Sequence, residues 1–183
     1  MKISSLALLA VVAIPASASA AIVALGNDLA ESCYLAAEAR NATPNNLETC
    51  DRALNEAPLS PRDRVATHVN RGVLHLNRAD LRAANADFDA ALAMDPNEPE
   101  AWLNKAVGHA KFGKSVEALP MVQKALDLNT RRPALAYFVR AMALEDSGNI
   151  VGAYRDLRRA RALEPKWKEP EIELRRFQVR QQG

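Results

Sequence analysis

The stretch MDPNEPEAW, residues 94–102, separates two apolar segments and decides how the rest of the chain is interpreted. The alanine-rich segment 83–94 ends shortly before Pro96, and a second apolar segment opens just after Pro99. Proline ends a helix because it lacks a backbone N–H and clashes with the preceding turn, whereas the first position of a helix tolerates it. The stretch therefore predicts two helices joined by a short turn, with Asn97 as the cap of the second helix.

The composition favours an all-helical protein. The 183 residues are 49% apolar, with alanine and leucine dominant, and both are strong helix formers. Aromatic residues make up only 5% of the chain, which is a poor composition for a β-sheet protein. The formal net charge of +2 is too small to indicate a nucleic-acid partner, and none is predicted.

The pattern around Pro96 recurs along the chain. Each unit carries three apolar residues with steps of four and three, and the units follow one another at intervals of 34 and 35 residues. A small residue stands twelve residues before each triplet. The triplets are Ala84, Phe88, Ala91; Ala118, Val122, Ala125; and Ala153, Leu157, Ala160, and the small residues are Gly72, Ala106 and Ala141. A period near 34 residues predicts a series of helical hairpins.

This spacing resembles the tetratricopeptide repeat. The resemblance implies an all-α fold, a right-handed α-α superhelix (solenoid) of three to four helical hairpins with a capping helix at the C-terminus. Hairpins of this kind stack because none can cover its own apolar face. Together with the signal peptide that the N-terminal residues predict at 1–20, the divisions are a degenerate hairpin at 21–64, repeats at 65–98, 99–132 and 134–167, and a capping helix or tail at 168–183.

Local signals indicate where several helices begin and end. Thr43 and Ser60 each precede a proline and are expected to cap helices. Pro120 falls inside a predicted helix, where it should either kink the helix or delay its start. The tail should form a helix from about Pro170, with Ile172, Leu174 and Phe177 covering the end of the last repeat.

The first twenty residues have the layout of a secretory signal peptide. Lys2 is followed by an apolar run over 6–15 and by small residues that favour cleavage after Ala20. The alternative is an uncleaved membrane anchor, since apolar residues continue to Leu25. The signal is short, as in bacteria, and it predicts a protein of the periplasm or a secreted one.

The two cysteines, Cys33 and Cys50, are interpreted together with the predicted export. In an oxidising compartment an isolated pair favours a disulfide bond. Reactive thiols or half of a metal site are the alternatives, although the spacing excludes C-x-x-C chemistry.

The resemblance implies that the first helix of each unit lines a concave groove. The residues placed there are mostly aliphatic, with Asn70 and Asn104 at equivalent positions. An asparagine amide can both donate to and accept from an extended peptide backbone, although both could merely satisfy neighbouring helices. The predicted groove residues are Val69, Asn70, Val73, Asn77, Leu103, Asn104, Val107, Lys111, Phe138 and Met142. They favour a non-enzymatic adaptor or scaffold for a protein or peptide partner; the protein's own tail or a second copy of the chain could also fill the groove.

No catalytic, cofactor-binding or metal-binding residue is predicted. His68, His75 and His109 occupy packing positions of the repeat, so we expect no convergence on a metal ion. The pair Asp87 and Asp89 is interpreted as a solvated helix face rather than as paired catalytic acids.

Charge is unevenly distributed, and basic residues outnumber acidic ones after residue 154. A dense group of arginines lies on the last repeat helix: Arg155, Arg158, Arg159 and Arg161. An ordinary solvated face with intrahelical pairs explains such a group. The alternative function is binding to the cell envelope, with these arginines making a weak contact to anionic lipid or polymer.

Overall fold

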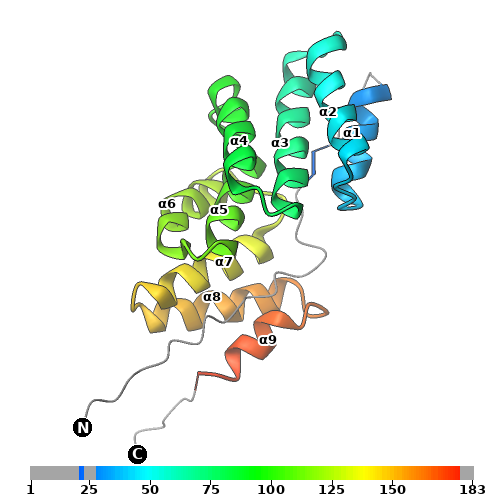
Figure 1. Cartoon of the computed structure of the whole chain (residues 1–183). Coiled ribbons are helices and arrows are strands. Elements are labelled where there is room, and N and C mark those ends of the chain that lie inside the picture. Colours follow the sequence, from blue (N-terminus) through cyan, green and yellow to red (C-terminus); the bar gives the residue numbers. More distant parts are fainter. Residues whose placement is uncertain (1–20, 23–27, 178–183) are drawn as a thin grey trace, which may run out of the picture.

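The computed structural model describes residues 21–22 and 28–177, and within them the regular structure is entirely α-helical (Figure 1). No helix in this part of the chain is long and apolar enough to cross a membrane. The signal peptide predicted at 1–20 lies outside the described residues. The helices are α1 Asp28–Glu38, α2 Pro44–Glu56, α3 Pro61–Asn77, α4 Leu81–Met94, α5 Pro99–Lys111, α6 Ser115–Asp127, α7 Pro133–Asp146, α8 Ile150–Leu163 and α9 Glu169–Leu174.

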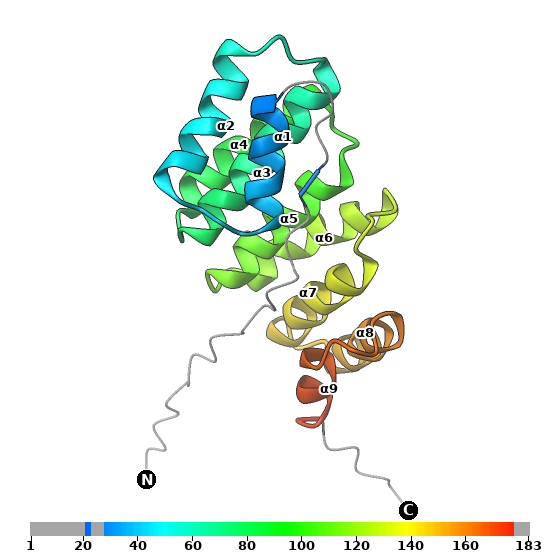
Figure 2. The same cartoon turned by 90° about the vertical axis from the view of Figure 1, so that its right-hand side faces the viewer.

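Consecutive helices pack against each other as hairpins, and the hairpins stack in the order of the sequence. The pairs α3–α4, α5–α6 and α7–α8 each form one unit, and α4 packs on α5 as α6 packs on α7. Figures 1 and 2 show the array rising from α8 and α9 at one end to α1 and α2 at the other. The predicted all-α solenoid is confirmed.

Side-chain caps begin two of the helices as predicted. The Thr43 hydroxyl accepts the N–H of Asn46 at 3.2 Å, and the Ser60 hydroxyl accepts that of Asp63 at 3.1 Å. The prediction for Asn97 is wrong. Glu98 caps α5 instead, because the backbone N–H of Asn97 donates to Asp95 in the preceding turn and Glu98 becomes the residue next to the helix.

Pro120 lies within α6, which starts at Ser115, so the predicted delay in the start of this helix does not occur. A proline here cannot donate to the carbonyl of Val116, four residues earlier. The side chain of Pro120 is exposed, so the freed carbonyl is near solvent rather than in the core.

The turns inside the hairpins need a left-handed residue. Gly113 and Gly148 adopt φ values of 75° and 85° there, a conformation that glycine reaches without steric cost. In the first repeat the equivalent residue is Ala79, which is forced to φ 61°. The same turn geometry is therefore imposed in all three units, whether or not a glycine is available.

Close helix packing in the first repeat depends on a small residue. Phe88 on α4 is fully buried, and its ring lies against Gly72 on α3, where an added Cβ would be 2.5 Å from ring carbon Cε1. Between the first and second repeats, Trp102 packs on the clusters of both and donates from Nε1 to the carbonyl of Pro96 at 2.9 Å. The aromatic residues thus fill the space within and between hairpins.

The N-terminal hairpin is held by a covalent link. Cys33 on α1 and Cys50 on α2 form a disulfide, with their Cα atoms 4.9 Å apart and both side chains fully buried. This confirms the prediction from the sequence. The hairpin core otherwise contains small residues such as Ala36 and Ala37, so the disulfide takes the place of large packing side chains.

The C-terminal helix is shorter than the predicted segment, and α9 ends at Leu174. Leu174 and Phe177 pack against the core of the last repeats as expected, but Ile172 is 54% exposed and covers nothing. The reason is that Trp167, in the turn before α9, already fills the end of the core beside Phe138, with ring centroids 4.9 Å apart.

Candidate functional site

One face of the array is built from the first helices of the repeats. α3 contacts α5, and α5 contacts α7, so the three helices follow one another along the array (Figure 2). Each is a regular helix that presents residues of the same register, because the repeats are 34 and 35 residues apart. We name the groove the part of this face that α3 and α5 form beside residues 21–22, after the concave surface that the repeat resemblance implies.

The decisive contact in the groove is made by Asn70, in the middle of α3. Its Oδ1 accepts the backbone N–H of Ile22 at 2.7 Å, and its Nδ2 donates to the carbonyl of Ile22 at 2.7 Å. A single amide side chain thus satisfies both backbone groups of one residue in another part of the chain. The short stretch 21–22 lies beside α3, outside every helix (Figure 1).

The side chain of Ile22 is buried together with the backbone contact. It is 3% exposed and belongs to the same apolar cluster as Ala66, Val69 and Ala101. Ala21 packs next to it on the cluster that contains Val73. The groove therefore holds Ile22 by two kinds of contact: backbone hydrogen bonds that do not depend on its side chain, and burial of that side chain in an apolar cluster.

The remaining predicted groove residues fall into two groups. Leu103, Asn104, Val107 and Phe138 are buried, and Phe138 is covered by Trp167 rather than by a groove occupant. The second group is more accessible: Asn77 and Lys111 are exposed and Met142 is partly buried. Lys111 is engaged all the same, because its Nζ donates to the carbonyl of Leu76 at 3.0 Å.

The interpretation of Asp87 as a solvated residue is wrong. Its side chain is 4% exposed, and Arg71 reaches it with Nη2 at 2.6 Å and Nε at 2.9 Å. His68 contacts the same carboxylate through Nδ1 at 2.9 Å. Burial opposes ionisation, but the hydrogen bonds from His68 and Arg71 outweigh it and hold the pKa of Asp87 below its usual value. Asp89 is exposed, as predicted.

The same ion pair recurs two units later. Arg140 on α7 binds Asp156 on α8 at 2.6 Å and 3.0 Å, and in both units the arginine precedes the aspartate by 16 residues. Sequence reasoning missed these pairs, although the repeated Arg–Asp spacing was a visible signal. They fasten the two helices of a hairpin to each other, α3 to α4 and α7 to α8.

The histidines do not gather around one point. His68 and His75 face Asp87, at 2.9 Å and 3.8 Å, whereas His109 faces Glu117 at 3.2 Å. Within the described part of the chain, no group of three metal-ligating side chains is present. These contacts are those of packing and ion pairing.

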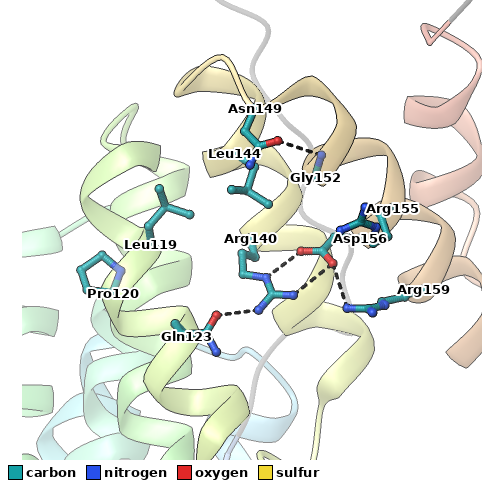
Figure 3. A pocket seen from close by; sticks show the side chains of 10 residues that line it. All are labelled: Leu119, Pro120, Gln123, Arg140, Leu144, Asn149, Gly152, Arg155, Asp156 and Arg159. Atoms are coloured by element: carbon teal, nitrogen blue, oxygen red, sulfur yellow. Dashed lines mark hydrogen bonds and ion pairs between the residues drawn. The ribbon is translucent and has the colours of Figure 1, made fainter.

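The arginine group divides between two hollows. Arg155 and Arg159 line one of about 410 Å³ between α6, α7 and α8, together with Arg140 (Figure 3). Arg158 and Arg161 line a second one beside α9, where Arg161 donates to Glu171 at 2.8 Å. Asp156 pairs with Arg140 at 2.6 Å and with Arg159 at 3.5 Å, so among the described residues the arginine of this hollow without an ion pair is Arg155.

Comparisons with known proteins add one similarity. No family model matches the chain. The chain is 30% identical over 110 residues to the human protein O-mannosyl-transferase TMTC3 (Homo sapiens), and the match covers 60% of this chain and 12% of that protein. The chain is a helical-repeat protein. Because the match covers only 12% of TMTC3, the transferase activity in that protein's name is not transferred to this chain. The similarity supports a protein-interaction role for the helical repeats.

Proposed function

We propose that the protein is a tetratricopeptide-type adaptor of the bacterial periplasm, which binds an extended segment of a partner protein in the groove and catalyses no reaction. The observation that carries the proposal is the pairing of Asn70 with both backbone groups of Ile22. A site that binds one residue through its N–H and carbonyl is suited to any segment that presents these two groups in the same way, as an extended segment of a partner can.

The oxidising compartment is proposed on two grounds. A disulfide such as Cys33–Cys50 is typical of proteins that fold outside the reducing cytosol. The sequence at 1–20 has the layout of a secretory signal with cleavage after Ala20. Both grounds can be tested by expressing the full chain in a bacterial host, fractionating the cells and measuring the intact mass of the exported product. A protein that stays in the cytosol and keeps residue 1 would refute the location.

Binding is tested with a synthetic probe of the sequence ASAAIVALG, residues 18–26, labelled with fluorescein. The receptor is the full chain carrying Ile22→Asp, which places a charge where the native occupant is buried and so vacates the groove. Fluorescence anisotropy should show saturable binding. Adding Asn70→Leu should abolish it, because the leucine keeps the shape but can neither donate nor accept.

The matched control is Asn55→Leu, the same exchange at an exposed position of α2. It should leave probe binding unchanged. Absence of saturable binding, or equal binding to the Asn70→Leu and Asn55→Leu receptors, would refute the groove as a peptide site.

A second function is favoured by the hollow that Arg155 and Arg159 line. Three arginines and one acidic residue, Asp156, border it, and Arg155 is exposed and makes no ion pair within residues 21–22 and 28–177. An anionic headgroup or polymer would find the guanidinium of Arg155 there, beside that of Arg159, which contacts Asp156. Cosedimentation of the protein with vesicles containing phosphatidylglycerol should decrease when salt is added. It should also decrease in the Arg155→Glu variant, but not in the control Arg62→Glu, which changes an exposed residue of α3. Binding that ignores salt and Arg155→Glu would exclude this function.

A further inference from the structure

We propose that Ala21-Ile22 is an intramolecular occupant of the groove, and that a partner binds by displacing it with an extended segment that carries a branched aliphatic side chain. The inference rests on the proposed function, since it concerns the same site. It adds the regulation of that site and the chemistry of the segment that fits it.

Direct competition follows from the hydrogen bonds. Both polar atoms of the Asn70 side chain are used by Ile22, and Asn70 is fully buried. A partner residue cannot pair with Oδ1 and Nδ2 in the same position while Ile22 occupies it. The groove therefore accepts either the N-terminal segment or a partner at this position, not both.

The surroundings of the Ile22 side chain define which residue fits beside Asn70. The apolar cluster there is composed largely of small or branched side chains, among them Ala66, Val69 and Ala101. An isoleucine fills the space with 3% of its surface left exposed. A charged side chain would lose its hydration there, and an aromatic ring would need the α3–α5 packing to widen. Isoleucine, valine and leucine are the residues that these surroundings favour.

An empty groove is the unfavourable state. Without an occupant, the amide of Asn70 loses two good hydrogen bonds on an apolar floor, and the cluster around Val69 is opened to water. Exchange of one segment for another avoids this cost. The N-terminal segment thus keeps the apolar groove covered until a partner arrives.

The segment is a strong competitor because it is tethered. Only residues 23–27 separate Ile22 from α1, which starts at Asp28 and is itself fixed by the disulfide. A short connection gives an effective concentration on the order of 1 mM. For a segment with an intrinsic Kd of about 0.1 mM, an added peptide should then bind roughly tenfold more weakly than it binds to a vacated groove.

The test compares receptors that differ only at the occupant. The fluorescein-labelled probe of residues 18–26 is titrated against the full chain, against Ile22→Asp, and against the milder Ile22→Gly. Both variants should bind the probe about tenfold or more tightly than the unaltered chain. The control Leu35→Asp makes a similar exchange at a 52% exposed position of α1 and should bind like the unaltered chain.

Hydrogen exchange of the Ile22 amide supplies a second measurement on the unaltered chain. The amide should exchange slowly, because its N–H is bonded to Asn70, and it should exchange quickly once the probe is saturating. Probe binding of equal strength to the unaltered chain and to both Ile22 variants would overturn the inference and leave the groove as a peptide site. No binding to either vacated receptor would refute the proposed function itself, and the inference with it.

Discussion

Replacing Arg71 with leucine should destabilise the protein strongly, because it leaves the buried carboxylate of Asp87 without its main partner. The two side chains are 22% and 4% exposed, and the guanidinium bonds to the carboxylate at 2.6 Å and 2.9 Å. Removing one partner of a buried ion pair costs about 3–5 kcal/mol. His68 keeps its contact at 2.9 Å, so we expect the lower end, about 3 kcal/mol.

Urea denaturation at pH 7, followed by circular dichroism, measures this loss. The matched control is Arg52→Leu, which breaks a pair with Glu56 on the surface of α2, where the two side chains are 51% and 57% exposed. A pair of that kind contributes only about 0–1 kcal/mol. The double variant of Arg71→Leu with Asp87→Leu should recover part of the loss, because no uncompensated charge stays buried.

Acid titration gives an independent check on the same pair. The folded-state pKa of Asp87 lies below its unfolded value of about 3.9, so its ionised form stabilises the fold above that unfolded pKa. That contribution should be lost as the pH falls from about 5 toward the folded-state pKa. Asp87→Asn should show a smaller loss over this range. An Arg71→Leu variant no less stable than Arg52→Leu, or an unchanged acid profile in Asp87→Asn, would refute the reasoning.

Three further predictions concern stability, and each is checked by urea denaturation. Ala79→Gly should stabilise the protein by about 0.5–1 kcal/mol, whereas Gly113→Ala should destabilise it by at least as much, since both positions have positive φ. Loss of the disulfide, in a variant with alanine at both Cys33 and Cys50, should cost about 2–4 kcal/mol and should make the unfolding midpoint insensitive to reducing agent. Thr130→Val should cost about 1–3 kcal/mol, because the Thr130 hydroxyl donates at 2.9 Å to a buried carboxylate. A loss of less than about 0.5 kcal/mol in the disulfide or threonine variant, or no gain in Ala79→Gly, would contradict the corresponding argument.

The architecture could be predicted because its determinants are local and repeat. Proline and the capping residues Thr43 and Ser60 end and begin helices through interactions that span only a few residues. The spacing of Gly72 and Phe88 reports how closely two successive helices approach, and it recurs with the period of the units. Periodic signals of this kind can be recognised in the sequence without knowledge of the tertiary contacts.

The contents of the groove could not be predicted in the same way. Ile22 lies 48 residues before Asn70 and outside the repeats, so no periodicity connects them. The sequence indicated that Asn70 was suited to an extended backbone, but not which backbone would reach it. The prediction that Asp87 is solvated was wrong for a related reason. A carboxylate is expected at the surface unless a partner is known, and the partner, Arg71, lies on the other helix of the hairpin.

The two proposed activities occupy different helices of each hairpin and can therefore be separated by mutation. The groove uses Asn70 on α3, with α5 beside it, whereas the arginine hollow is bordered mainly by α6 and α8. Arg140 and Leu144 also border the hollow, but they lie on α7, which is not one of the two helices of the groove. Arg155→Glu should thus leave probe binding to the vacated groove unchanged, and Asn70→Leu should leave vesicle binding unchanged. If one substitution weakened both, the two faces would be coupled through the packing of the hairpins and would have to be treated as a single site.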